Sequence, residues 1–402
     1  MNNIILFDDD KWRDLLPLCL TRPVAKLRIG IFTIAEKWEK HLNGQSSYIT
    51  QDYLSEKYKI DISSDNYVIN SRWLPNQKLV SLIRNLGMND ALLFDETLVA
   101  ARMDNKQFNR LLDNTELNEL KGIDISKNGA DFTVINRPHH IFIHNGDEIR
   151  KDFELIDKSS AQLKLDKSVQ VYGDHPVYIH PTAKLMHCTI NSSDGPVYIG
   201  ENAEVMEGSA LRGPLAICNN TIIKMGAKVY KDSTFGPFCK IGGEVSNVVF
   251  IGYANKAHDG YLGNSVIGEW CNLGAGTNCS NLKNNYSEVK LWNYKSKRFE
   301  KTETQFCGLI MGDHSKCGID VMFNTGTVVG VSANIYGSGY PRNYIPSYSW
   351  GGASNYKTFR IEEALDVANK VMERRGMELS QEDKLIMEHI FYSTSSYRSW
   401  ES

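Results

Sequence analysis

The fold of this chain is decided by residues 198–243, which read YIGENAEVMEGSALRGPLAICNNTIIKMGAKVYKDSTFGPFCKIGG. Large apolar residues recur here at every sixth position, namely Ile199, Val205, Leu211, Ile217, Ile223, Val229, Phe235 and Ile241. The same rhythm returns further on, at Ile267, Leu273, Met311, Cys317, Phe323, Val329 and Ile335. A period of six is neither helical nor that of a simple alternating strand. It is the signature of a parallel β-helix built from hexapeptide repeats.

Each repeat of such a fold is one short strand and one turn, and three repeats make one triangular coil. Residue i therefore stacks on residue i+18 and points inward, which explains why it is apolar. Each buried side chain in the stack contributes roughly 1.5–3 kcal/mol. Glycine often follows the inward position, as in Ile199-Gly200 and Ile241-Gly242, where it relaxes the corner. Of the 31 glycines, 25 lie after residue 150, which separates this half from the rest.

The repeat is interrupted twice. Residues 247–262 leave the rhythm and deliver His258. Residues 278–306 leave it again, and within them residues 288–293 and 297–302 have the pattern of two hairpin arms. Since functional residues concentrate in loops on rigid scaffolds, both interruptions are candidate sites.

The first 165 residues alternate buried strands with amphipathic helices. We expect strands at 3–7, 47–50, 66–70 and 91–94, and helices at 31–42, 77–86 and 104–113. This alternation predicts an α/β domain with a partly parallel sheet. A helix over 149–165 should lead into the next domain.

The last residues have helical spacing at 358–375 and 381–392, with Gly376 ending the first helix and Ser380 as the N-cap of the second. The predicted organisation is therefore an α/β domain at 1–165, a β-helix at 166–345 and a helical tail at 346–402.

Composition narrows the class of protein. The net charge of −3 offers no basic surface for nucleic acid. No apolar run approaches the ~20 residues of a membrane span. Acidic residues 8–10 stand where a signal peptide needs its apolar core, so a cytoplasmic protein is expected. The eight cysteines form no Cys-x-x-Cys pair, and we interpret them as reduced apolar fillers with no metal site.

The α/β domain lacks the glycine-rich turn that usually brings backbone N–H groups to phosphate, because its first glycine is Gly30. Thr21, Arg22 and Lys26 offer polar and cationic groups to a nucleotide phosphate, and a solvated loop is an equal alternative. The acidic run at 8–10 has ligands for Mg²⁺, although a solvated turn is favoured.

A longer motif carries a family resemblance. Lys256-Ala-His-Asp-Gly-Tyr-Leu-Gly263, then Asn272-Leu-Gly-Ala-Gly-Thr277, then Asn281 resemble the hexapeptide acyltransferases. The closest likeness is to the bifunctional sugar-1-phosphate nucleotidyltransferase/amino-sugar-phosphate N-acetyltransferases. The hairpin after Asn281 is similar to the archaeal branch. The opening residues 6–9, 16–18 and 21–23 resemble a divergent branch labelled as a sugar nucleotidyltransferase.

The resemblance implies a left-handed β-helix and a homotrimer that holds acetyl-CoA between neighbouring subunits. It implies that His258 is the general base, and that Tyr261 and Asn272 contact the sugar phosphate. Lys256 is a candidate phosphate ligand or a solvated loop cation. Ala275 and Asn281 would line the acetyl-CoA channel. Leu282 departs from the bacterial pattern, which has a tyrosine there.

The chemistry fits a histidine. An amine that attacks a thioester loses a proton as the new bond forms, and an imidazole with an ordinary pKa near ~6.5 accepts it at neutral pH. A backbone N–H of the 274–276 corner is a candidate donor to the tetrahedral oxyanion.

Three functions follow in order of preference. The first is an acetyl-CoA-dependent N-acyltransferase acting on an amino-sugar phosphate or nucleotide sugar. The second is a sugar-1-phosphate nucleotidyltransferase that uses Mg²⁺, with the β-helix as a trimer scaffold. The third is a binding protein with two inactive sites.

Overall fold

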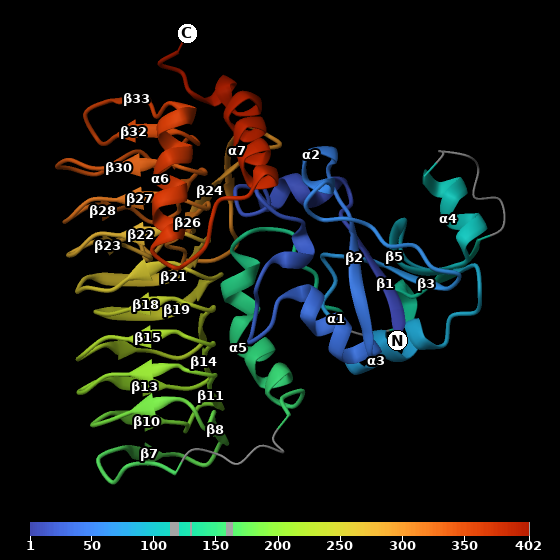
Figure 1. The fold of residues 1–402 in the computed structure, drawn as a ribbon, viewed down its shortest axis with the longest axis horizontal. Coiled ribbons are helices and arrows are strands. Elements are labelled where there is room, and N and C mark those ends of the chain that lie inside the picture. The colour runs from blue at the N-terminus through green and yellow to red at the C-terminus, as the bar shows by residue number, and fades with distance from the viewer. Residues whose placement is uncertain (113–119, 129–130, 158–163, 402) are drawn as a thin grey trace. The chain divides into compact units, whose positions relative to one another are not determined.

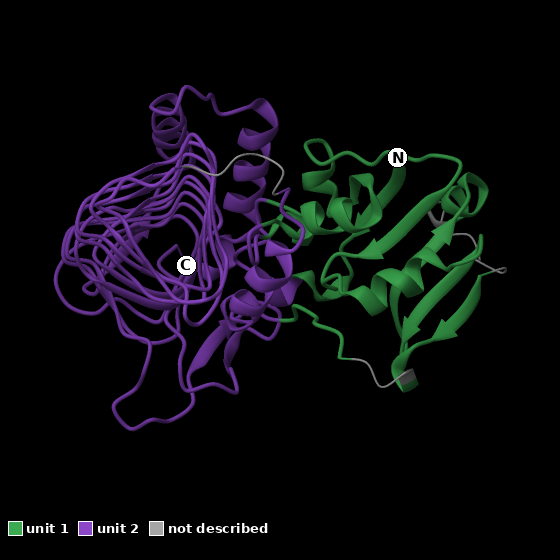
Figure 2. Ribbon diagram, turned by 90° about the horizontal axis from the view of Figure 1, so that it is seen from below, with its two compact units in different colours: residues 1–12, 22–27, 32–136 green, residues 13–21, 28–31, 137–402 purple. Residues whose placement is uncertain are grey.

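The computed structural model describes residues 1–112, 120–128, 131–157 and 164–401 (Figure 1). These residues form two compact units (Figure 2). The first comprises residues 1–12, 22–27 and 32–136, and the second comprises residues 13–21, 28–31 and 137–402. Apart from the two short segments 13–21 and 28–31, the chain passes from the first unit to the second after residue 136, whereas the sequence predicts a domain boundary near residue 165.

The first unit contains a six-stranded sheet in the order β2-β1-β3-β5-β4-β6. Its strands are β1 (Asn2–Phe7), β2 (Gly44–Ile49), β3 (Asn66–Asn70), β4 (Asp90–Phe94), β5 (Thr97–Met103) and β6 (Lys121–Asp124). Strand β1 pairs in parallel with β2 and β3, while β5 is antiparallel to both of its neighbours. The predicted α/β domain with a partly parallel sheet is confirmed.

The helices of this unit are α1 (Ile34–Leu42), α2 (Asp52–Ser55), α3 (Gln77–Arg84) and α4 (Asn105–Leu112). Helix α1 begins with a capping box, because the Thr33 hydroxyl accepts from the Glu36 N–H and the Glu36 carboxylate accepts from the Thr33 N–H. The predicted helix over 104–113 corresponds to α4, and residue 113 lies outside the described residues.

The second unit is a parallel coil with three faces, as predicted. The first face consists of β8 (Val177–Ile179), β11 (Val197–Ile199), β14 (Leu215–Ile217), β17 (Ser233–Phe235), β26 (Leu309–Met311), β29 (Thr327–Val329) and β31 (Tyr344–Ile345). The third consists of β7 (Gln170–Tyr172), β10 (Thr189–Asn191), β13 (Ala210–Arg212), β16 (Lys228–Val229), β23 (Asn278–Cys279) and β28 (Met322–Phe323). Two longer strands, β19 (Glu244–Phe250) and β21 (Tyr261–Ile267), turn the corner and belong to both faces.

The second face is a separate ten-stranded sheet, and it positions the candidate site. Its parallel strands are β9 (Lys184–Leu185), β12 (Glu204–Val205), β15 (Ile222–Ile223), β18 (Lys240–Ile241), β20 (Asn255–Lys256), β22 (Asn272–Leu273), β27 (Lys316–Cys317), β30 (Asn334–Ile335) and β32 (Ser349–Gly351). An antiparallel strand, β33 (Tyr356–Thr358), ends the sheet. Viewed along the axis, successive coils superimpose (Figure 2).

The inward residues of each face form apolar columns. Ile199 pairs with Ile217, Ile217 with Phe235, and Phe235 with Phe250, and all four are fully buried. Because each column continues through the coil, it builds one contiguous core. The six-residue period of the sequence therefore gives both the strand positions and the core.

The first interruption of the six-residue rhythm, at residues 247–262, does not interrupt the coil. Residues 247–262 form a complete coil through β19, β20 and β21. Phe235 pairs with Phe250 and Phe250 with Ile267, so these coils take fifteen and seventeen residues instead of eighteen. The corners are shorter, which shifts the sequence rhythm while the strands stay in register. The second interruption is confirmed, because β24 (Lys290–Asn293) and β25 (Arg298–Lys301) form an antiparallel hairpin.

Several glycines after inward residues are required by close approach between coils. A Cβ on Gly236 would lie 1.9 Å from the carbonyl oxygen of Ile251 in the next coil. Positive φ occurs instead at a later corner position, which is occupied by Asn202, Asn220, Phe238, Tyr253 and Trp270 in successive coils. At Gly236, glycine is therefore required because the next coil leaves no space for a Cβ, and not because it relaxes the corner as the sequence predicts.

Helix α5 (His140–Phe153) packs on the coil and contacts β14, β17, β19 and β21. The predicted helix over 149–165 begins nine residues too late, and residues 158–163 lie outside the described part of the chain. Asn145 anchors α5, since its amide donates to the carbonyl oxygen of Asp232 at 2.9 Å and to the Thr234 hydroxyl at 3.1 Å.

The tail contains α6 (Ile361–Glu373) and α7 (Gln381–Ser393), and the Ser380 hydroxyl caps α7 by accepting from the Asp383 N–H. Both predicted tail helices are confirmed.

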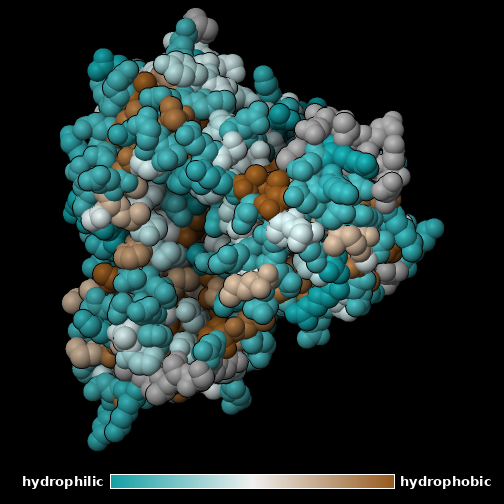
Figure 3. All heavy atoms as spheres, turned by 45° about the vertical axis from the view of Figure 1, so that its right-hand side comes forward, coloured by the Kyte–Doolittle hydropathy of each residue, from teal (hydrophilic) through white to brown (hydrophobic). Residues whose placement is uncertain are grey.

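Hydrophilic side chains predominate on the face shown in Figure 3, in keeping with the inward placement of the apolar columns. Among the described residues, no helix has the length and apolar character needed to span a membrane.

The columns make a direct prediction about stability. Val229 is buried in β16, whereas its neighbour Lys228 is exposed on the outer side of the same strand. We expect Val229→Asp to lower the free energy of unfolding by at least about 4 kcal/mol, because it buries an unpaired carboxylate. Lys228→Asp should change it by less than about 1 kcal/mol. Thermal and urea unfolding of both variants test this, and equal stabilities would show that the column does not hold the coil together.

Candidate functional site

The candidate site is centred on the corner that follows β20. His258 lies exposed at this corner, between β20 and β21. Lys256, two residues earlier, is only 1% exposed and stands at an inward position, paired with Ile241 of the preceding coil. Its ammonium donates to the carbonyl oxygens of His258 at 2.8 Å and of Gly242 at 3.2 Å. Lys256 therefore fixes the backbone that carries the imidazole.

The environment of Lys256 lowers its pKa. Burial lowers the pKa from 10.5 to about 8, and the nearby carboxylate of Asp259 only partly opposes this. A lysine in a column of apolar residues is costly unless its donors are paired, and two of its three donors reach carbonyl oxygens.

The 274–276 corner lies one coil above His258. The Gly276 N–H donates to the carbonyl oxygen of Asp259 at 3.0 Å, and the Gly274 N–H donates to that of Cys317 at 3.1 Å. The N–H of Ala275 has no acceptor among the described residues. Of the three amides in this corner, Ala275 is thus the one with a donor to offer.

Gly260 explains how the chain turns from His258 back into the coil. Its φ is +117°, and a Cβ there would lie 2.1 Å from the carbonyl oxygen of Thr277. Both features require glycine at this position.

Tyr261 and Asn281 come together beside this corner. The Asn281 amide donates to the Tyr261 hydroxyl at 3.0 Å and to the Asn264 side-chain oxygen at 2.7 Å. Burial raises the pKa of Tyr261, so the phenol stays protonated and keeps a proton to donate. Gly263 makes room for this cluster, since a Cβ there would lie 2.3 Å from the Tyr261 hydroxyl.

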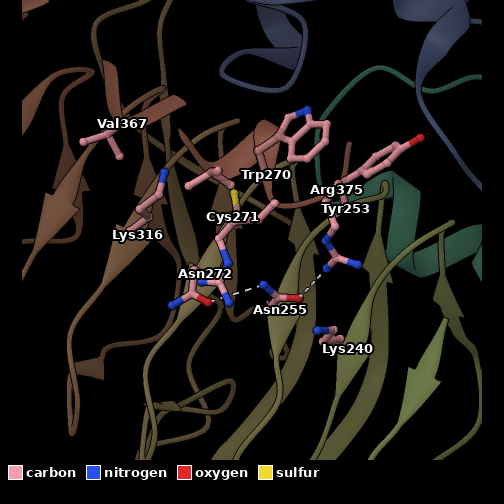
Figure 4. A pocket seen from close by; sticks show the side chains of 11 residues that line it. Lys240, Tyr253, Asn255, Trp270, Cys271, Asn272, Lys316, Val367 and Arg375 are labelled. Carbon is pink, nitrogen blue, oxygen red and sulfur yellow. Dashed lines mark hydrogen bonds between the residues drawn. The ribbon is translucent and has the colours of Figure 1, made fainter. Parts of the chain in front are cut away.

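Asn272 lies exposed on the outer side of the second face. It lines a cavity of about 460 Å³ (Figure 4), and its side-chain oxygen lies 3.5 Å from the Asn255 amide nitrogen. The structure therefore brings His258 and Ala275 to stacked corners, with Lys256 buried beside them, and brings Tyr261 to Asn281, while Asn272 lies on the flat face.

The predicted nucleotide-binding residues divide between the units. Thr21 belongs to the second unit, where its hydroxyl donates to Asp313 at 2.6 Å. Arg22 and Lys26 belong to the first unit. Arg22 is buried, and the Lys26 ammonium lies 4.9 Å from the centre of the Tyr48 ring. Burial works to lower the pKa of Lys26, but Tyr48, Glu39 and Glu36 together outweigh it and the pKa is raised.

The acidic run is less solvated than predicted. Asp8 accepts from the Thr50 hydroxyl at 2.8 Å and from the Val24 N–H at 3.1 Å. Burial raises the pKa of Asp8 to about 7. Asp9 forms an ion pair with Arg72. Burial works to raise the pKa of Asp9, and hydrogen bonds from Arg72 and Asn70 reverse this.

These contacts bear on the Mg²⁺ that nucleotidyl transfer would use. The Asp8 and Asp9 carboxylates already accept from protein donors, and the described residues contain no group of three His, Cys, Asp or Glu placed to hold a metal ion. The described residues therefore do not form a preformed Mg²⁺ site.

Sequence reasoning missed two supporting roles. The inward position of Lys256 follows from its pairing with Ile241 in the preceding coil. It cannot be predicted from the six-residue period, because the shortened coils shift that period. Asn264, the third member of the Tyr261 cluster, stands one residue after a glycine at a left-handed corner with φ of 46°. The sequence spacing of Tyr261, Asn264 and Asn281 does not predict that they meet, because Asn281 reaches the other two residues from the next coil.

Comparison with known proteins gives a family match for the N-terminal part of the chain. Residues 4–161 match the family described as "Sugar nucleotidyl transferase", so the N-terminal part of the chain carries a domain of that kind.

Two relatives carry names that describe bifunctional proteins. The chain is 41% identical over 87 residues to "Bifunctional protein GlmU" of Methanocaldococcus jannaschii, covering 22% of this chain and 21% of that protein. It is 34% identical over 144 residues to "Bifunctional sugar-1-phosphate nucleotidylyltransferase/acetyltransferase" of Sulfurisphaera tokodaii, covering 35% of each. The matches thus span about a fifth to a third of these relatives. The predicted resemblance is confirmed.

Among solved structures, the polySia-specific acetyltransferase NeuO is similar with 12% identity and a TM-score of 0.27, covering 48% of this chain and 87% of that one.

The buried Lys256 predicts how stability depends on pH. Its folded pKa of about 8 lies below the ordinary 10.5, so between these values the unfolded chain holds a proton that the folded protein has released. The free energy of unfolding should therefore rise with pH across this window, by up to about 3 kcal/mol relative to Lys256→Met.

The measurement is chemical unfolding at pH 7 to 10.5 for wild type, Lys256→Met and Lys228→Met. The exposed Lys228 variant should follow the wild-type curve. If the Lys256→Met curve also runs parallel to wild type, Lys256 does not titrate as the buried position requires.

Proposed function

We propose that this protein is an acetyl-CoA-dependent N-acyltransferase that acts on an amino-sugar phosphate or a nucleotide sugar, with His258 as the general base. The observation that carries the proposal is the His258 corner. The imidazole is exposed, while its backbone is tied to a buried ammonium at 2.8 Å. An exposed base on a fixed backbone is what proton transfer from a bound amine needs.

The chemistry then assigns roles to the neighbouring groups. The amine attacks the thioester carbonyl carbon, and the C–N bond forms as the imidazole of His258 takes the amine proton. The tetrahedral oxyanion accepts from the Ala275 N–H, the corner amide with no acceptor among the described residues. Collapse of the intermediate breaks the C–S bond, and the CoA thiolate takes the proton back from the His258 imidazolium and leaves as a thiol. Tyr261 and Asn281 contribute hydroxyl and amide groups to the sugar and to the acyl chain.

A strip of apolar residues above Ala275 supports an acyl-CoA cosubstrate. Ile319, which follows the glycine stacked on Gly274, is 72% exposed, and Tyr336 in the next coil is 46% exposed. Apolar side chains on an outer corner suit the pantetheine arm of CoA or the side of a neighbouring subunit. The named activity of the Sulfurisphaera relative, which includes acetyl transfer, agrees with this reading.

A second activity is favoured by one specific observation, the family match of residues 4–161. It is the transfer of a nucleotidyl group to a sugar-1-phosphate with release of pyrophosphate. Arg22 and Lys26 of the first unit remain its candidate phosphate ligands, although Arg22 is buried and the Lys26 ammonium already lies over the Tyr48 ring. Acyl transfer is therefore the function that the site supports best.

The first test is thiol release from acetyl-CoA with glucosamine-1-phosphate as acceptor. His258→Ala should lower kcat/KM by about 10²–10⁴, the usual contribution of a general base. The matched control is His187→Ala, which removes another exposed corner histidine of the coil and should change kcat/KM by less than twofold.

The same preparations are assayed for pyrophosphate release from a nucleoside triphosphate and a sugar-1-phosphate, which should be insensitive to His258→Ala. Full acyl transfer by His258→Ala would exclude His258 as the base. Pyrophosphate release alone, across a broad panel of acceptors, would favour the second activity.

The proposal extends to a homotrimer, because the site occupies an outer corner of the coil and needs a second wall to enclose CoA. Light scattering coupled to gel filtration should give three times the mass of the chain. A monomer with full acyl transfer would contradict a site shared between subunits.

A further inference from the structure

The cavity lined by Asn272 has a second feature that the proposed acyl transfer does not use. Its floor is the outer side of the second face, where Lys240, Asn255, Asn272 and Lys316 lie on four adjacent strands (Figure 4). Its wall is the end of α6 together with Arg374 and Arg375, which follow that helix. The volume of about 460 Å³ is within the usual range for small-molecule sites.

The lining carries a concentrated positive charge. It includes Lys240, Lys316, Arg374 and Arg375, and none of the described residues that line it is acidic. Four cations in one cavity repel one another, and water alone screens them poorly in a partly closed space. An anion is the partner that removes this repulsion.

The titration of the lysines agrees with this picture. Burial and then the positive charges of Arg375, Lys224 and Arg374 lower the pKa of Lys240. Burial lowers the pKa of Lys316 to about 8. The Lys316 ammonium donates to the carbonyl oxygen of His314 at 2.7 Å, which leaves two of its donors for another acceptor.

The arginine is held in a defined orientation. The Arg375 guanidinium donates to the Asn255 side-chain oxygen at 3.2 Å, and the Asn255 amide faces Asn272 at 3.5 Å. Figure 4 shows this chain of contacts as dashed lines that cross the floor of the cavity. A planar guanidinium that is fixed in this way can present its remaining N–H groups to two oxygens of one phosphate.

We propose that this cavity is a phosphate-binding site for a phosphorylated small molecule, with Arg375, Lys240 and Lys316 as its ligands. A phosphate or diphosphate group matches the number of cations and the fork of Arg375 better than a single carboxylate does. The phosphate has two sources in this chemistry, the phosphorylated sugar or nucleotide on one side and CoA on the other. The proposal does not depend on acyl transfer by His258.

The test is isothermal titration of the full-length protein with inorganic pyrophosphate. We expect a dissociation constant below about 1 mM that weakens as salt is raised. Arg375→Gln and Lys240→Gln should each weaken binding at least about tenfold, the scale of one lost charge-assisted hydrogen bond. Lys370→Gln is the matched control, since Lys370 is exposed on α6 and pairs with Asp366, and it should change the constant by less than twofold.

Competition identifies the source of the phosphate. Glucosamine-1-phosphate is compared with glucosamine, CoA with dephospho-CoA, and UTP with uridine, each against pyrophosphate. His258→Ala should bind pyrophosphate like wild type, so loss of acyl transfer and loss of this site are separate outcomes. Thermal melting confirms that each variant is folded.

Two results would overturn the proposal. One is the absence of pyrophosphate binding by wild type at millimolar concentration. The other is equal binding by Arg375→Gln, Lys240→Gln and Lys370→Gln, which would show that pyrophosphate binds the general surface and not this cavity.

Discussion

The stacking of inward side chains from one coil to the next is the constraint on which the second unit depends. The buried columns run from Ile199 through Phe235 and Phe250 to Ile267, and they let the corners vary in length while the strands keep their register. Because each inner strand of the coil is paired with the coil before it and the coil after it, a corner residue there inherits a nearly fixed backbone position. Catalytic geometry on this scaffold therefore comes from the register of the coil.

Lys256 shows the cost of that arrangement. It takes a place in a column of apolar residues, between Ile241 and Leu273, and burial disfavours its charge. The column would be more stable with an aliphatic residue, since an ammonium loses its water on entering it. In return, its donors hold the carbonyl oxygens of Gly242 and His258. Lys256 therefore lowers the stability of the core and fixes the corner that carries His258. This exchange is expected where the geometry of that corner matters for function.

The sequence predicts the parts of the fold that repeat. The period of six identifies the strands and the core, and the hairpin and the two tail helices follow from local patterns. Corner lengths are harder, because the short corners around Gly243, Asn247 and Asn264 break the period without breaking the coil. Helix α5 is misplaced for a related reason. It begins at His140 without a side-chain cap, so its start depends on packing against the coil and leaves no local signal.

The candidate site divides in the same way. His258 and Tyr261 can be found from the motif, because their chemistry depends on residue type and spacing. The contacts that support them cannot, because Tyr261 meets Asn281 and Lys256 meets Gly242 only through neighbouring coils. The cation-lined cavity is the extreme case, since Lys240, Lys316 and Arg375 are far apart in the chain. Each reads alone as an ordinary surface cation, and only the register of the second face and the end of α6 place them around one space. Asn272 lines that space and lies three residues before Ala275, which is at most about 10 Å along the chain. The cavity therefore neighbours the corner where acyl transfer is proposed.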